Sequence, residues 1–167
     1  MMTAASSEAR TDTVFKTISV AAPAALAFRV FTEGMSTWWP LATHHIGKAA
    51  AQTVAIEPGV GGRCYERGVD GSECVWGHVR VWDPPGRLVF SWEISAEWQT
   101  DARVQTLVEV RFLADGPGRT RVELTHSNLG VYGENLEKMR KSFESEGGWP
   151  GLLQLFANSA ASAASAA

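Results

Sequence analysis

Glu66 and His126 are the two residues whose type and setting could do acid/base chemistry in this chain. Alternation in the flanking sequence places each of them on the apolar face of an expected strand. A carboxylate shielded from water must meet a cation, accept several hydrogen bonds or take a raised pKa. An imidazole in such a place could bind a ligand carbonyl or move a proton near neutral pH. Glu66 and His126 are therefore the catalytic candidates if the protein is an enzyme.

Each residue also has a plainer interpretation. Glu66 could lie near the rim of the sheet and reach water or an arginine. His126 could form a hydrogen bond that ties its strand to the loop before the last helix. Their strands are far apart in the expected sheet order, so only a ligand that spans a cavity would join them. The sequence leaves these alternatives open.

Other reaction chemistries find no support in the residue spacing. Cys64 and Cys74 are expected on opposite faces of one hairpin, which predicts free thiols. No Ser/His/Asp, Cys/His or phosphate-loop pattern is present. The cysteines match no zinc-binding spacing with the four histidines, which are His44, His45, His78 and His126. We therefore expect neither a metal nor a cofactor.

Charge and hydropathy argue against two classes of partner. The 167 residues carry a net charge of -3 with scattered Lys and Arg, which does not favour nucleic-acid binding. No run approaches the roughly 18 continuous apolar residues needed to cross a membrane. The N-terminal segment lacks the apolar core of a signal peptide, so a cytoplasmic location is expected.

Two turn signals predict a three-stranded meander over residues 61–92. Asp70-Gly71 suits a tight hairpin, and Asp83-Pro84-Pro85-Gly86 cannot continue a ladder. Counting outward from both turns pairs Glu66 with Val75 and Val81 with Leu88. One face is then nearly all apolar and carries Cys64, Glu66, Val75, Gly77, Val79, Val81, Leu88, Phe90 and Trp92.

The opposite face of this meander would carry three aromatic residues among charged ones. They are Tyr65, Trp76 and Trp82. Exposed aromatic side chains need a cover. Either the segment 41–51, whose path the sequence does not predict, or a second subunit could supply it, so a homodimer through this face is one hypothesis.

The remaining pattern predicts one domain over residues 13–160, with a disordered segment 1–12 and a frayed Ala/Ser tail 161–167. Further strands are expected at Thr13–Val20, Gln52–Glu57, Val104–Leu113 and Thr120–Ser127, and helices at Pro23–Phe31, Met35–Trp39 and from Gly133 onward. Gly147 to Pro150 would kink or split the last helix. The order is β-α-α-β6-α, an α+β fold in which the last helix covers the apolar face of an antiparallel sheet.

Several short motifs in this order resemble the helix-grip (SRPBCC) superfamily, which includes START lipid-transfer domains, the birch pollen allergen and polyketide cyclases. The branch is similar to that of homologues of the activator of the heat-shock protein ATPase. The motifs include Trp38-Trp39, Gly61-Gly62, Asp70-Gly71, Pro84-Pro85, Leu124-Thr125-His126 and Gly148-Trp149.

The resemblance implies a curved seven-stranded antiparallel sheet around a long C-terminal helix, with a cavity between them. It implies binding of a small hydrophobic or amphipathic molecule. Two alternatives stay open, namely a cyclase, hydratase or isomerase that uses the same cavity, and a co-chaperone-like interaction module. The expected ligand-binding residues are Trp39, Glu66, Val79, Phe90, Trp92, Thr106, Val108, His126, Trp149 and Leu153.

Overall fold

A single antiparallel sheet of seven strands forms the body of the molecule in the computed structural model, which describes residues 12–166. The strand order is β1-β7-β6-β5-β4-β3-β2. The strands are β1 (Val14–Val20), β2 (Ala51–Ile56), β3 (Arg63–Gly68), β4 (Glu73–Asp83), β5 (Arg87–Trp92), β6 (Thr106–Ala114) and β7 (Thr120–Ser127). Of the expected disordered segment 1–12, all but Asp12 lies outside the described residues.

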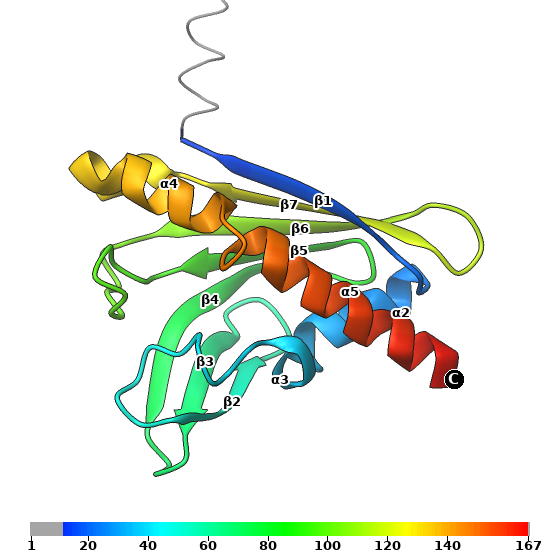
Figure 1. The fold of residues 1–167 in the computed structure, drawn as a ribbon, viewed down its shortest axis with the longest axis horizontal. Helices are drawn as coiled ribbons and strands as arrows, with labels where there is room; N and C mark the ends of the chain where they lie inside the picture. Colours follow the sequence, from blue (N-terminus) through cyan, green and yellow to red (C-terminus); the bar gives the residue numbers. More distant parts are fainter. Residues whose placement is uncertain (1–11, 167) are drawn as a thin grey trace, which may run out of the picture.

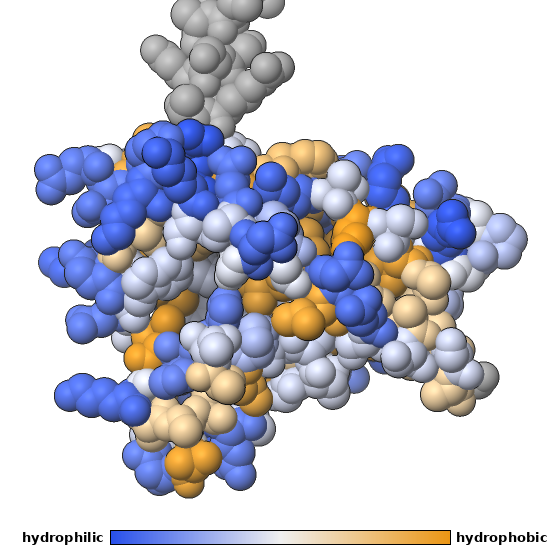
Figure 2. All heavy atoms as spheres, in the orientation of Figure 1, coloured by the Kyte–Doolittle hydropathy of each residue, from blue (hydrophilic) through white to orange (hydrophobic). Residues whose placement is uncertain are grey.

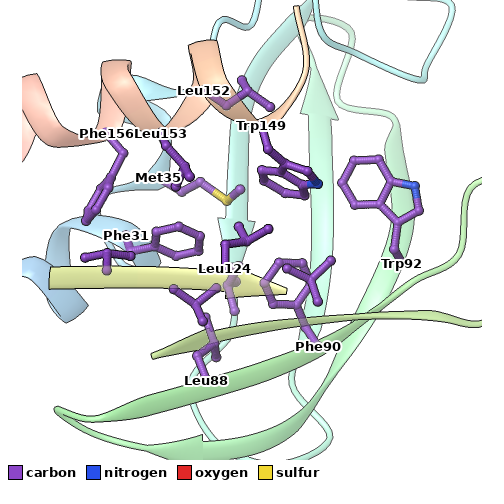
Figure 3. Packing of buried hydrophobic residues seen from close by; sticks show 14 of the residues in the cluster. Phe31, Met35, Leu88, Phe90, Trp92, Leu124, Trp149, Leu152, Leu153 and Phe156 are labelled. Carbon is purple, nitrogen blue, oxygen red and sulfur yellow. The ribbon is translucent and has the colours of Figure 1, made fainter. Parts of the chain in front are cut away.

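Helices cover one face of this sheet. They are α2 (Ala24–Thr32), α3 (Met35–Trp38), the 3-10 helix η1 (Leu129–Asn135), α4 (Leu136–Glu144) and α5 (Trp149–Ala166). Figure 1 shows α5 crossing the sheet, with α2 and α3 beside its C-terminal half. Side chains from α2, α3 and α5 meet those of the central strands in one hydrophobic core (Figure 3). The expected order and the helix-grip fold are both confirmed.

Buried and more exposed residues alternate along β6 and β7. Their inward residues are all buried: Thr106, Val108, Val110, Phe112, Thr120, Val122, Leu124 and His126. The meander is confirmed too, with both turns where the sequence put them. Cys64 pairs with Gly77 and Val79 with Phe90.

The predicted register fails in two places on β4, and the two errors have one cause. Glu66 pairs with Cys74 rather than Val75, and Leu88 pairs with Trp82 rather than Val81. In each case β4 carries one extra residue against its partner strand, which is a β-bulge. The residues of β4 between each bulge and its turn therefore lie on the opposite face from the one predicted. Both cysteines are free, although Cys74 now faces the same side as Glu66.

These bulges also correct the expected outer aromatic face. Trp76 is only 4% exposed and stacks edge-on against Phe90. Trp82 packs against Phe28 of α2, with ring centroids 5.1 Å apart. Only Tyr65 remains outside, where the Arg63 guanidinium lies over its ring. Trp76 and Trp82 therefore give no reason to expect a homodimer through this face.

The C-terminal helical region is split rather than kinked. Helix α4 ends at Glu144 and α5 begins at Trp149. A side chain at Gly148 would collide with the carbonyl oxygens of Ser142 and Phe143, so only glycine permits this close return of the chain. Helix α5 continues to Ala166, through most of the segment expected to fray, because alanine favours helix and Ala163 and Ala164 pack on the core.

Candidate functional site

A cavity of about 420 Å³ lies between the sheet, the α4–α5 connection and the segment 41–46. Figure 2 shows the face over it, where hydrophobic side chains appear within a hollow bordered by hydrophilic ones. Its lining combines large aromatic side chains with polar ones. It consists of Trp39, Leu41, Thr43, His44, His45, Ile46, Val54, Glu66, Trp76, Trp92, Ile94, Trp98, Ser142, Phe143, Ser145, Gly147, Gly148, Trp149 and Leu152.

Trp92 and three neighbouring indole and phenyl rings form a continuous aromatic wall. The ring centroid of Trp92 lies 5.7 Å from that of Trp149, 5.6 Å from Phe143 and 5.8 Å from Trp76. Figure 3 shows Trp149 and Trp92 side by side although they come from α5 and β5. Edge-to-face packing of this kind fixes each ring by its neighbours, so the wall is preformed.

Glu66 lies in this cavity and is 5% exposed. Its Oε1 accepts a hydrogen bond from the Ile46 amide at 2.5 Å, and its Oε2 accepts one from the Gly47 amide at 3.0 Å. Of the options open to a buried carboxylate, this one therefore accepts hydrogen bonds, and they come from the backbone of the segment 41–50. Glu66 fixes that segment against the sheet.

His126 is fully buried and does not line the cavity. Its Nδ1 accepts a hydrogen bond from the Trp149 indole at 3.1 Å, so Nε2 carries the proton that it shares with the Thr106 hydroxyl at 2.8 Å. Burial lowers the pKa of His126 from 6.5 to about 3. This neutral imidazole holds Trp149 in place at the start of α5.

The expected ligand-binding residues thus fall into two groups. Trp39, Glu66, Trp92 and Trp149 line the cavity. The other six are buried in the core without lining it, namely Val79, Phe90, Thr106, Val108, His126 and Leu153. Glu66 and His126 therefore do not meet across the cavity, because the rings of Trp92 and Trp149 flank His126.

Sequence reasoning missed the residues that the segment 41–50 brings to the cavity. His44 and His45 both line it, and they had been considered only as zinc ligands. The segment has no regular structure whose periodicity could place its side chains. The signal available was the pair of adjacent histidines, His44 and His45.

The two histidines differ in what their ring nitrogens do. His44 uses both, because Nε2 donates to the Gly147 carbonyl at 2.7 Å and Nδ1 lies 2.8 Å from the Thr43 hydroxyl. It thereby bridges the segment 41–50 to the α4–α5 connection. His45 Nδ1 donates to the Gly47 carbonyl at 2.9 Å. A neutral ring with Nδ1 protonated leaves Nε2 as an acceptor.

Trp98 adds a ring from the loop 95–102, with its centroid 6.1 Å from that of Phe143. Its backbone adopts φ 60°, a left-handed conformation that is unusual for a bulky residue. Forty per cent of Trp98 is exposed, so the ring sits at the edge of the cavity rather than in its floor. Strain of this kind is held where surrounding contacts fix the residue.

Two further properties bear on the kind of site. Among residues 12–166, no cluster of three or more His, Cys, Asp or Glu could hold a metal ion. No helix in that described part of the chain is long and apolar enough to span a membrane. The cavity lining itself offers aromatic surfaces, a carboxylate, imidazoles and hydroxyl groups.

Comparison with known proteins gives both a family and a similar synthase. The family described as "Activator of Hsp90 ATPase homolog 1-like protein" matches residues 21–159. The anthrahydroquino-γ-pyrone synthase Txn09, solved in complex with SUM, is 40% identical with a TM-score of 0.62, over 87% of this chain and 95% of that one.

Two other solved structures share the fold. The self-sacrificing resistance protein CalC from Micromonospora echinospora is 28% identical with a TM-score of 0.65, over 92% of this chain and 97% of that one. The protein NE0264 from Nitrosomonas europaea is 13% identical with a TM-score of 0.66, over 92% and 97% of the two chains. None of the curated proteins compared with the chain matches it.

Proposed function

Since the chain belongs to the family of Activator of Hsp90 ATPase homolog 1-like proteins, we propose that it binds a flat polycyclic aromatic molecule in the cavity beneath α5. The observation that carries the proposal is the preformed aromatic wall of Trp76, Trp92, Phe143 and Trp149. A flat aromatic ligand can contact such a wall without any rearrangement of the rings.

Burial of apolar surface supplies the affinity in this proposal. Every 100 Å² of ligand surface removed from water contributes about 2.5 kcal/mol before the cost of association is counted. The polar groups at one end of the cavity, among them His45 and Glu66, would select ligands that also carry hydroxyl or carbonyl groups. The 40% identity with an anthrahydroquino-γ-pyrone synthase supports this ligand class.

Titration with an anthraquinone tests the proposal, with tryptophan fluorescence as the readout. Trp92 and Trp149 line the cavity, so a bound quinone should quench their emission to saturation at one ligand per chain. Ser142→Phe places a ring in the cavity and should abolish quenching. Lys141→Phe, on the next position of α4 but outside the lining, is the matched control and should bind normally.

A result that would overturn the proposal is equal quenching in the wild-type protein and in Ser142→Phe. Binding would then take place elsewhere on the surface. Absence of saturable quenching by any of several flat aromatic compounds would overturn it as well.

Catalysis on the same ligand class is the second candidate function, and one observation favours it. The similar protein Txn09 is named as a synthase of a γ-pyrone, a ring that contains oxygen. Turnover would separate the two functions, because a carrier returns the ligand unchanged and a synthase does not. A product that differs in mass from the added compound, found by mass spectrometry, would establish the enzyme.

For the interaction-module alternative, we expect a filled core with Trp76 and Trp82 exposed or in a subunit contact. Trp76 instead lines a cavity, and Trp82 packs against Phe28. Neither condition is met, which favours the small-molecule proposal.

A further inference from the structure

We propose that His45 accepts a proton from an acidic hydroxyl group of the bound molecule, so that the cavity selects phenols and enols and binds them as anions. This inference rests on the proposed function, because it assigns a role to one residue of the same cavity. It narrows the ligand class from flat aromatic molecules to those that carry an ionisable hydroxyl group.

The backbone presets the tautomer of His45 for this role. A carbonyl oxygen can only accept, so the 2.9 Å contact between Nδ1 and the Gly47 carbonyl requires the proton on Nδ1. The lone pair of the neutral ring is then on Nε2, for which residues 12–166 supply no hydrogen-bond partner. The ring lines the cavity, and the proposal places the ligand hydroxyl at this nitrogen.

The other candidate bases already make hydrogen bonds within the protein. Both nitrogens of His44 are engaged, by Gly147 and by Thr43. Each oxygen of Glu66 holds a backbone amide. His126 is buried outside the lining, and both of its nitrogens are bonded. Among the imidazoles of the cavity lining, His45 alone keeps a nitrogen for a ligand.

Glu66 acts on this base indirectly, as a positioning residue. It binds the amides of Ile46 and Gly47, the two residues that follow His45 in the chain. The Gly47 carbonyl, which orients the imidazole, thus belongs to a residue whose own amide is tied to the sheet. This arrangement keeps the direction of Nε2 fixed relative to the aromatic wall.

The proton transfer is balanced and needs no further reactant. The O–H bond of the ligand breaks and its electron pair stays on oxygen, while the lone pair of Nε2 forms the new N–H bond. The products are a phenolate or enolate and an imidazolium, which attract each other strongly in a cavity with aromatic walls. Such an anion is also a stronger oxygen nucleophile than the parent hydroxyl.

Alizarin, a dihydroxyanthraquinone whose visible absorption changes when a hydroxyl ionises, is a suitable probe. We expect the wild-type protein to lower the apparent pKa of the bound dye by about one to three units relative to the free dye. His45→Gln should still bind the dye but lose this shift, since its amide can donate to Gly47 and cannot take up the proton. His78→Gln, a histidine outside the cavity lining, is the matched control and should retain the shift.

Other titratable groups near His45 must be separated from it. His44 and Glu66 line the same end of the cavity, and the Cys74 thiol lies behind Gly47. Burial raises the pKa of the Cys74 thiol above its ordinary value, which favours the neutral form. Loss of the shift in His44→Gln but not in His45→Gln would overturn the assignment.

Two outcomes keep this inference separate from the proposed function. If the dye does not bind, the proposed function fails. If it binds and its pKa is the same in the wild type and in His45→Gln, only the role of His45 fails. Should His45→Gln not fold, ¹⁵N NMR of histidine-labelled wild-type protein gives the answer, because the His45 Nε2 signal should move to the imidazolium position when alizarin binds and an unmoved signal would refute the transfer.

Discussion

Replacement of Glu66 by glutamine tests whether this carboxylate fixes the segment 41–50. Both carboxylate oxygens accept backbone amides, from Ile46 and Gly47. Glutamine offers one oxygen, and its NH₂ group would face the other amide as a second donor. Hydrogen bonds to a charged group contribute about 1.5–3 kcal/mol each. The loss of one bond and the weakening of the other should therefore cost the segment about 2–4 kcal/mol.

Amide hydrogen exchange measures this effect where it arises. A cost of 2 kcal/mol corresponds to roughly 30-fold faster exchange, because 1.36 kcal/mol is a factor of ten. We expect at least this acceleration at Ile46 and Gly47 in Glu66→Gln, with much smaller changes in β6 and β7. Global unfolding should shift less than local exchange, since the core strands do not depend on this segment.

Glu73→Gln is the matched control on the neighbouring strand. Glu73 pairs with Arg63 and Arg67 on the surface, and its side chain is 31% exposed. Solvent-exposed ion pairs of this kind contribute up to about 1 kcal/mol. Unchanged exchange at Ile46 and Gly47 in Glu66→Gln, or equal acceleration in Glu73→Gln, would refute the assigned role of Glu66.

Three further predictions concern the framework of the cavity. The pKa of His126 is lowered to about 3 in the folded state, so the unfolded chain binds more protons than the folded one between pH 6.5 and 3. The free energy of unfolding should therefore fall by up to about 1.4 kcal/mol per pH unit as the pH drops through this window. Denaturant titrations should show this slope in the wild type, and an equal slope in His126→Phe would contradict the prediction. Gly148→Ala should lower thermal stability markedly, because the new methyl group meets the carbonyl oxygens of Ser142 and Phe143, whereas Gly116→Ala, with open space around it, should cost only the strain of its positive φ. Trp98→Gly should be more stable than Trp98→Ala by up to about 1 kcal/mol, since glycine tolerates the left-handed backbone and both variants lose the same ring. Chemical denaturation compares the two variants, and a less stable glycine variant would argue against backbone strain at this position.

The meander shows which parts of the fold the sequence could predict. Asp-Gly and Pro-Pro-Gly turns fix where strands end, and alternation fixes which face is apolar, so the strands and their order followed from local chemistry. The bulges of β4 did not, because an extra residue in one strand is set by the fit of side chains such as Trp76 against Phe90 and Trp92. This is why Trp76 and Trp82 were expected on the wrong face.

The sequence predicts the aromatic walls of the candidate site but not its polar end. Trp39, Trp92 and Trp149 follow from the ends of regular elements, which periodicity locates. His44 and His45 lie on an irregular segment whose path depends on a distant carboxylate, Glu66, and no local pattern encodes that contact. For the same reason, Glu66 was recognised as unusual before its partners could be named.

A crystal structure of the protein grown with alizarin tests the central claim most directly. We expect the dye in the cavity beneath α5, in contact with Trp92 and Trp149, with one hydroxyl oxygen within hydrogen-bond distance of His45 Nε2. An empty cavity beside a dye bound elsewhere on the surface, or a cavity closed by its own side chains, would contradict the account.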